Sequence, residues 1–204
     1  MRRFLPVAVF AALLAAPALA APAIDAASGH YVLDPAHASV TWKIMHLGLS
    51  NYTARFAKID STVDLDAATP ANSKLSVTID ANSVRTDFPF PEKTNFDKEV
   101  GGDARFLDGE KFPEIKFVAT KITATGPKSG TVTGDLTLRG VTKPITLAAT
   151  FNGTMKANAM MGAAKFGISA HGSIKRSDFG MTYGGQFLGD TVELLIEAEY
   201  KLAK

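Results

Sequence analysis

The reactive side chains of this 204-residue chain do not form a recognisable catalytic arrangement. The nearest match to a nucleophile elbow is GISAH at residues 167–171, which lacks the final glycine and lies in a strand-like run. The sequence contains neither a P-loop nor a GxGxxG motif, and its acidic residues are scattered on polar faces rather than paired. The sequence therefore predicts a protein that is not an enzyme.

The sequence also lacks a recognisable metal-binding motif. Cysteine is absent, which excludes a thiolate metal site, a cysteine nucleophile, a disulfide framework and a lipid-modified N-terminal cysteine. His37, His46 and His171 are candidate ligands, but no HExxH-like spacing or carboxylate pair accompanies them. We expect neither a metal ion nor a cofactor.

Two polar residues are candidates for contacting the polar head group of a ligand. His46 has the same strand parity as the apolar residues before it, so its imidazole is expected to point inward near the end of a strand. Arg176 can hold an anionic or carbonyl group in a bidentate manner. Each residue also has a structural alternative. The His46 imidazole can hydrogen-bond to the backbone at the end of its strand, and an Arg176–Asp178 pair can hold the turn at residues 176–180.

The N-terminus has the pattern of an export signal. A basic start at residues 1–3 is followed by an apolar run to about residue 16 and by the small-residue site Ala18-Leu19-Ala20. We expect cleavage after about Ala20 and a periplasmic product. The apolar run is shorter than the ~20 residues of a spanning helix, so we expect no integral membrane segment.

The charge of the expected mature chain argues against nucleic acid as a partner. Losing Arg2 and Arg3 with the signal reduces Lys+Arg from 22 to 20, which equals the 20 Asp+Glu. With 46% hydrophobic and 21% charged residues, residues 21–204 are expected to fold as one globular domain.

The elements that must position the candidate residues are strands. Apolar and polar residues alternate along residues 40–45, which is typical of a half-buried strand. Similar runs bring the predicted number of strands to about eight, at residues 40–44, 52–56 continuing after a bend to 63–65, 75–79, 115–119, 132–138, 145–151, 166–168 and 192–200.

Turn signals separate these runs, and no βαβ rhythm is present. Turns are expected at residues 66–73, 126–130, 139–140 and 184–185, and Asn152-Gly153 favours a two-residue hairpin. Residues 89–113 lack alternation and are interpreted as a helical insertion, with short helices at 92–99 and 103–107. The pattern predicts an all-β protein, either an antiparallel barrel or a sandwich.

A set of apolar side chains is expected to line the interior. If these residues bind a ligand they form an apolar pocket, and if they do not they are simply packed core; composition alone does not decide between the two. The set comprises Val40, Trp42, Ile44, Phe56, Phe117, Leu136, Leu138, Phe166, Ile168 and Phe179.

Four sequence segments occur in an order that is typical of one protein family. They are YVLDPAHASV at 31–40 with HLG at 46–48, ARFLD at 104–108 with KFPEIKF at 111–117, GDLTLRGVTKPI at 134–145, and IKRSDFG at 174–180 with GDTV at 189–192. Together they resemble the YceI-like family of exported lipocalin-like barrels. Ala54, Lys175 and the Pro- and Phe-rich segment 87–95 depart from the usual family pattern, which affects loop shape and pocket contour.

The resemblance implies an extended eight-stranded antiparallel barrel with a short helical insertion, whose interior holds a polyprenyl, isoprenoid-quinone-like or other long-chain lipid. We therefore expect a periplasmic carrier or scavenger, and the family also implies a homodimer. The alternative is a stress-related structural or interaction module with a filled core that binds no lipid. A quinone-dependent redox enzyme would need a cofactor or reactive pair that the sequence does not supply.

Overall fold

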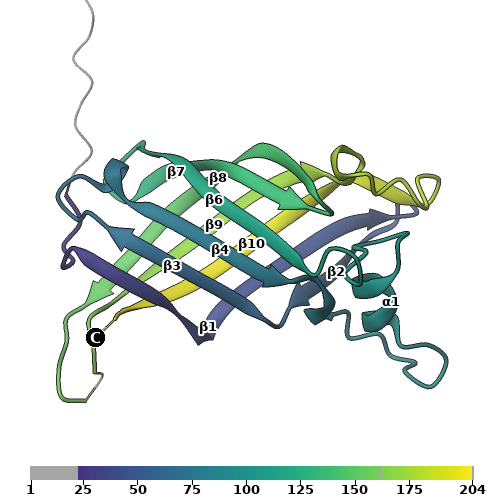
Figure 1. Ribbon diagram of the computed structural model, residues 1–204, viewed down its shortest axis with the longest axis horizontal. Coiled ribbons are helices and arrows are strands. Elements are labelled where there is room, and N and C mark those ends of the chain that lie inside the picture. The colour runs from purple at the N-terminus through teal and green to yellow at the C-terminus, as the bar shows by residue number, and fades with distance from the viewer. Residues whose placement is uncertain (1–22, 161, 204) are drawn as a thin grey trace, which may run out of the picture.

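The computed structural model describes residues 23–160 and 162–203, and the predicted export signal at residues 1–20 lies outside this part of the chain. The described chain is an elongated β-barrel with a short helical segment at one end (Figure 1). Its strands are β1 Gly29–His46, β2 Ser50–Phe56, β3 Ile59–Leu65, β4 Lys74–Asp80, β5 Val84–Arg85, β6 Glu114–Ala124, β7 Ser129–Leu138, β8 Val141–Met155, β9 Lys165–Lys175 and β10 Leu188–Leu202. The helix is α1 Phe96–Gly102, and three 3-10 turns are η1 Pro70–Asn72, η2 Ala81–Ser83 and η3 Arg176–Phe179.

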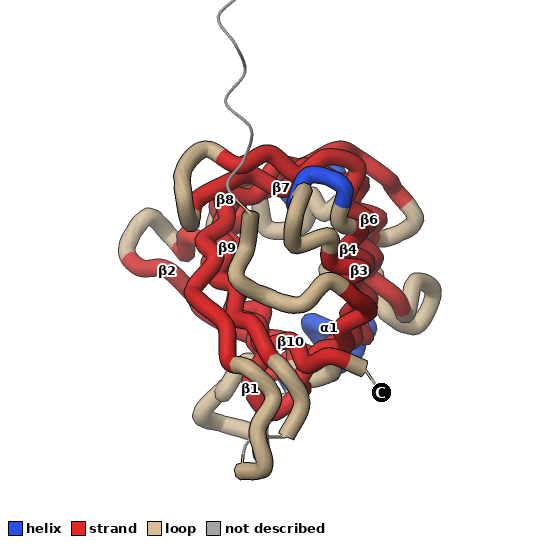
Figure 2. The backbone as a smooth tube through the Cα atoms, turned by 90° about the vertical axis from the view of Figure 1, so that its left-hand side faces the viewer, coloured by secondary structure: helices blue, strands red, loops and turns tan. Residues whose placement is uncertain are grey.

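The sheet closes on itself through pairing of β10 with β1. All neighbouring strands are antiparallel, in the order β10-β9-β8-β7-β6-β4-β3-β1-β2-β5. Segments β2 and β3 form one wall strand interrupted at residues 57–58, and β4 and β5 form another interrupted by η2. The barrel therefore has eight wall strands, which confirms the predicted fold. Figure 2 shows the strands as a ring seen from one end.

The apolar residues of each strand face the interior because side chains alternate between the two faces of a sheet. The larger of two core clusters includes Val40, Phe117 and Leu136, whereas the smaller one contains Tyr31, Phe166 and Tyr200. In the smaller cluster the Phe166 ring lies 4.8 Å from that of Tyr31 and 5.1 Å from that of Tyr200. These three rings pack together near the end where the chain enters and leaves the barrel.

The predicted hairpin at Asn152-Gly153 is wrong. Strand β8 runs straight through these residues, and the register with β9 shifts between Phe151 and Gly153, so the pair forms a bulge. The two-residue turn with positive φ occurs instead at Arg139-Gly140, where φ is 52° and 74°. Arg139 accepts this conformation because its guanidinium donates to the carbonyls of Ala104 and Phe106, which ties the hairpin to the insertion.

The helical insertion is shorter than expected. Helix α1 begins after Asn95, whose side chain accepts a hydrogen bond from the Lys98 N–H at 3.0 Å. Pro89 and Pro91 lie in the turns that precede it, where missing N–H groups cost little. The predicted helix at 103–107 is wrong: this segment forms turns, in which the guanidinium of Arg105 bonds to the carboxylates of Asp103 and Glu99.

The loops divide between the two ends of the barrel (Figure 1). The end that holds α1 also carries the β1–β2 turn, the β7–β8 hairpin and residues 180–187, which we call the lip. At the opposite end, the segment leading into β1 lies across the ring (Figure 2), with the Ile24 N–H donating to the Ala67 carbonyl at 2.8 Å. None of the helices in the described ranges has the length and apolar character needed to cross a membrane.

Candidate ligand-binding cavity

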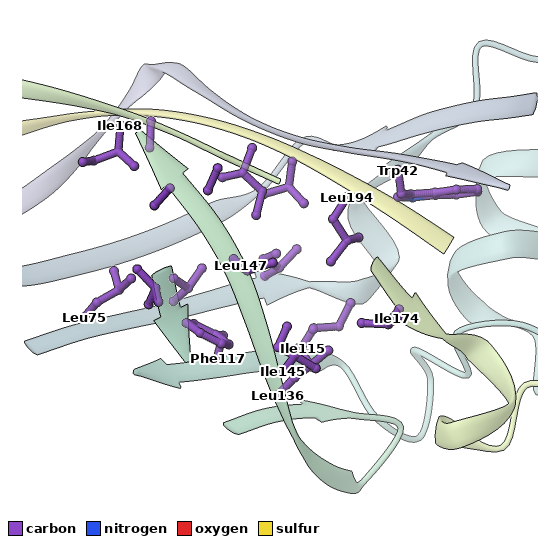
Figure 3. Close-up of a pocket in the computed structure, with 18 of the residues that line it drawn as sticks. Trp42, Leu75, Ile115, Phe117, Leu136, Ile145, Leu147, Ile168, Ile174 and Leu194 are labelled. Carbon is purple, nitrogen blue, oxygen red and sulfur yellow. The ribbon is translucent and has the colours of Figure 1, made fainter. Parts of the chain in front are cut away.

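The barrel interior contains a cavity of about 680 Å³. Alternate residues from the wall strands line it, for example Leu136 and Leu138 of β7 and Leu194 and Ile196 of β10. Figure 3 shows the side chains of Leu136, Leu194, Trp42, Phe117 and Leu147 in the close-up of this cavity. The volume falls within the ~300–1,000 Å³ typical of small-molecule pockets, and the walls offer an apolar ligand almost only apolar contacts.

Eleven of the twelve residues predicted to contact a ligand line this cavity. They are Val40, Trp42, Ile44, His46, Phe56, Phe117, Leu136, Leu138, Phe166, Ile168 and Arg176. Phe179 does not line it: at 2% exposure it packs into the main core from η3, followed by Gly180 in the left-handed conformation. Parity along a strand does not apply to a 3-10 turn, so the direction of Phe179 could not be read from the alternation.

Several lining residues were not predicted. Leu147, Ile145, Leu75, Ile115 and Leu194 lie in the strand runs that the sequence identified, and their inward parity is the signal that would have found them. Phe88 and Phe96 come from the insertion, where no periodicity indicates direction. These two aromatic rings contribute to the wall at the α1 end.

A polar pair interrupts the otherwise apolar interior. The hydroxyls of Ser61 on β3 and Tyr200 on β10 lie 2.9 Å apart, and both residues are buried. Burial raises the pKa of the Tyr200 phenol, and its hydrogen bond to Ser61 opposes this only in part. Tyr200 is thus neutral under ordinary conditions and presents no charge to a bound chain.

His46 lies at the α1 end of the cavity, at the last position of β1. Its side chain is exposed and also lines the cavity, as the strand parity predicted. The register of β1 with β2 is unbroken from Ile44 to His46, so regular alternation along β1 sets the direction of His46, and the register shift against β10 at this point does not change it. Within the described part of the chain its imidazole makes no hydrogen bond, which leaves both ring nitrogens available to a head group at the mouth.

Arg176 is buried, with 6% exposure, and holds the lip. Its guanidinium donates to four backbone carbonyls, those of Met181 and Tyr183 at 2.7 Å, Gly189 at 2.9 Å and Leu188 at 3.4 Å. The alternative Arg176–Asp178 pair does not form, since Asp178 bonds to Lys143 at 3.0 Å. Most of the Arg176 donors are thus engaged in positioning the lip beside the cavity.

The three histidines considered as metal ligands are not brought together. His37 and His46 lie on separate parts of β1, and His171 is exposed on β9. His37 instead meets Asp34 at 3.3 Å and Glu199 at 3.8 Å on the outer surface. Lys165 bonds to Asp34 at 3.1 Å and is the main reason that the pKa of this carboxyl is lowered. The Lys165–Asp34 ion pair ties β1 to β9, and the contact between His37 and Glu199 joins β1 to β10.

The serine and histidine of the GISAH sequence do not face the cavity. Ile168 and Ala170 line it, so Ser169 and His171 point to the outer face of β9. The Ser169 hydroxyl donates to the Glu197 carboxylate at 2.5 Å and accepts from the Asn152 amide at 2.9 Å. This serine therefore has a structural role in joining β8, β9 and β10.

The chain is similar to proteins of one family over most of its length. A model of the YceI-like domain matches residues 31–200. A UPF0312 protein of Pseudomonas putida (strain W619) is 40% identical over 192 residues, which cover 93% of this chain and 95% of that protein.

Solved structures show the same architecture. The crystal structure of the Campylobacter jejuni YceI protein superimposes with a TM-score of 0.65 and 32% identity, covering 79% of this chain and 91% of that one. A polyisoprenoid binding domain from Saccharophagus degradans gives a TM-score of 0.62 at 15% identity, covering 85% of this chain and 98% of that one, which is a likeness of fold alone.

Proposed function

Because the chain belongs to the YceI-like family, we propose that it is a carrier that encloses an isoprenoid or other long-chain amphiphilic lipid inside its barrel. The observation that carries this proposal is the apolar cavity of about 680 Å³. It argues against the alternative of an interaction module with a filled core, because such a module would have no interior space for a chain. The fold is shared with a polyisoprenoid binding domain from Saccharophagus degradans.

The free energy of binding would be mainly hydrophobic. At roughly 0.8 kcal/mol per buried CH₂, a five-carbon isoprene unit contributes about 3–4 kcal/mol before ordering and association costs. A few units therefore suffice for tight binding. Contacts from His46, or from the remaining donor capacity of Arg176, would select among head groups more than they would determine whether a chain binds.

The proposed carrier acts outside the cytoplasm without catalysing a reaction. The N-terminal signal pattern supports export to the periplasm, with cleavage after about Ala20. N-terminal sequencing of protein recovered from the periplasmic fraction tests this part of the proposal. Pairing into a homodimer is a further expectation from the family, and light scattering of the purified protein tests it.

The lipid can be identified directly. Native mass spectrometry of protein expressed in its host, followed by organic extraction, should reveal a stoichiometric long-chain lipid. In a second assay, the apo protein is titrated with geranylgeraniol and with a prenylated benzoquinone. Trp42 is the single tryptophan of the chain and lines the cavity, so quenching of its fluorescence by the quinone reports occupancy.

Two neighbouring residues on β6 provide a matched pair of variants. Phe117 lines the cavity, whereas Val118 is 50% exposed on the outer face. Phe117→Glu places a charge in the apolar interior and should abolish binding, whereas Val118→Glu should bind like the parent protein. If a folded Phe117→Glu protein retains the lipid, or if the parent protein binds neither probe and carries no extractable lipid, the proposal is wrong.

A further inference from the structure

Exposed apolar side chains are concentrated on the loops at the α1 end of the barrel. Leu47 and Leu49 project from the β1–β2 turn with 52% and 83% exposure, Tyr183 and Phe187 belong to the lip, and Phe90 lies in the loop before α1. We call these five residues the rim. The loops that carry them gather at the right-hand end of Figure 1. Soluble surfaces rarely collect large apolar side chains at loop tips without a binding role.

The rim is held in place rather than being a set of loose loops. The Leu47 N–H donates to the Phe187 carbonyl at 2.6 Å, which joins the β1–β2 turn to the lip. Arg176 fixes the lip through the carbonyl of Tyr183. Leu47 has a φ of 54°, a conformation that leucine rarely adopts, so the fold maintains an unfavourable backbone while its side chain stays outside.

A series of aromatic rings connects the cavity with the rim. Ring centroids are 6.4 Å apart for Trp42 and Tyr52, 6.0 Å for Tyr52 and Phe96, 5.3 Å for Phe96 and Phe88, and 5.6 Å for Phe88 and Phe90. The first four residues line the cavity, and Phe90 is 46% exposed. An apolar chain can thus remain in contact with apolar surface from the outside of the protein to the cavity.

Cations lie over the aromatic rings of the rim. The Lys93 ammonium is 4.3 Å from the centroid of Phe90, and the Arg105 guanidinium is 5.0 Å from that of Tyr183. Rings that are apolar on one side and contact a charged, hydrated group on the other suit the boundary between hydrocarbon and water. The arrangement resembles the residue chemistry found at membrane interfaces.

From these observations we propose that the rim docks the α1 end of the barrel on the surface of a lipid bilayer, from which the chain enters the cavity. The proposal rests on the proposed function as a lipid carrier and adds its partner and its point of entry. The cavity also reaches the opposite end, where Ile24, Pro70 and Pro127 line it, but residues 23–28 lie across that end of the ring.

A second copy of the chain fits the rim less well than a bilayer does. The five partly exposed side chains offer on the order of 500 Å², below the ~800 Å² per partner of a stable protein interface. They also project from separate loop tips, which a fluid bilayer accommodates without shape complementarity. Residues 86–113 carry seven acidic and four basic residues, so docking should depend on apolar insertion and not on anionic lipid.

Vesicle flotation tests the docking. Full-length mature protein, loaded with geranylgeraniol from detergent or left apo, is mixed with phosphatidylcholine vesicles with and without phosphatidylglycerol. The Leu49→Glu/Phe187→Glu protein should float on the order of a hundredfold less than the parent protein, because two apolar anchors become charged. Leu195→Glu, at a residue 44% exposed on the outer wall, and Met160→Glu, at a residue 90% exposed at the opposite end, should float like the parent.

The readouts separate failure of this inference from failure of the proposed function. Equal flotation of the rim variant and its controls, a requirement for phosphatidylglycerol, or conversion of a dimer to a monomer by the rim substitutions would overturn bilayer docking while leaving lipid binding intact. Loading from detergent bypasses docking, so the rim variant should still bind geranylgeraniol. If even the parent protein cannot be loaded from detergent, the carrier function itself fails.

Discussion

Tyr200 donates a hydrogen bond to Ser61 across 2.9 Å of the barrel interior, joining β10 to β3. The direction follows from the second bond of Ser61, whose single hydroxyl hydrogen is given to the Ser76 carbonyl at 2.8 Å. Ser61 therefore accepts from the phenol. The Ser61 hydroxyl takes part in two hydrogen bonds and the Tyr200 hydroxyl in one, so removing the first should affect stability more than removing the second.

Removing the Ser61 hydroxyl should cost more stability than removing the Tyr200 hydroxyl. Ser61→Ala leaves the buried Tyr200 phenol without its acceptor and removes the hydroxyl bond to the Ser76 carbonyl, which should lower the free energy of unfolding by about 1–3 kcal/mol. Tyr200→Phe removes only the donor to Ser61, which still bonds to Ser76, and should cost about 0.5–1.5 kcal/mol. Urea unfolding followed by Trp42 fluorescence measures both. Equal or reversed losses would show that the assigned direction is wrong.

Stability should fall at alkaline pH because of buried tyrosines. Burial raises the pKa of Tyr31, Tyr52 and Tyr200 above the ordinary value of 10.0. The folded protein therefore holds protons that the unfolded chain releases above pH 10, so these groups leave stability unchanged below that pH and reduce it as pH rises further. Urea unfolding across this range should show a shallower decline for Tyr200→Phe than for the parent. An identical slope in the two proteins would exclude Tyr200 as a contributor.

The barrel could be predicted from the sequence because the alternation of apolar and polar residues along each strand shows which side chains face inward. Where a bulge or a turn interrupts this alternation, the prediction fails. Strand β1 contains an irregularity between Leu33 and Ala38, so Tyr31 and Leu33 face inward with odd parity whereas Val40 and Trp42 do so with even parity. Only the alternation after this point was used for prediction. A bulge inserts a residue without a composition signal, and for the same reason Asn152-Gly153 was mistaken for a turn.

The candidate site was predictable to the extent that it is built on strands. Trp42, Phe117 and Leu136 line the cavity as their alternation indicated. Phe179 could not be placed because a 3-10 turn has no two-residue period, and Phe88 was missed because it lies in an aperiodic loop. The volume of the cavity could not be predicted either, because it depends on the distance between opposite walls of the barrel and not on the pattern of any single strand.

Arg176→Lys tests whether this residue acts mainly as the anchor of the lip. Lysine keeps the charge but cannot reach four carbonyls with one ammonium group, so the variant should lose about 2–4 kcal/mol of stability. Hydrogen exchange should accelerate at residues 181–189 in the absence of any ligand. Lys175→Arg, a change at the exposed neighbouring residue, is the control and should leave both measurements unchanged. A variant with normal stability and exchange but weaker binding of an anionic lipid would instead indicate head-group contact.

Filling the cavity from one wall provides a test of ligand position that does not introduce a charge. Ala170 lines the cavity on β9 opposite Ile196 and Ala149 in its two ladders. In Ala170→Phe the added ring should occupy empty space and contact apolar atoms that lack partners, raising the free energy of unfolding of the apo protein by about 1–2 kcal/mol. The same ring should weaken geranylgeraniol binding at least tenfold because the chain and the ring compete for one volume.

Leu195→Phe, on the outer face of β10, controls for added apolar surface and should bind normally. Unchanged affinity in a stabilised Ala170→Phe protein would place the bound chain away from β9, whereas opposite changes in stability and affinity would place it against this wall.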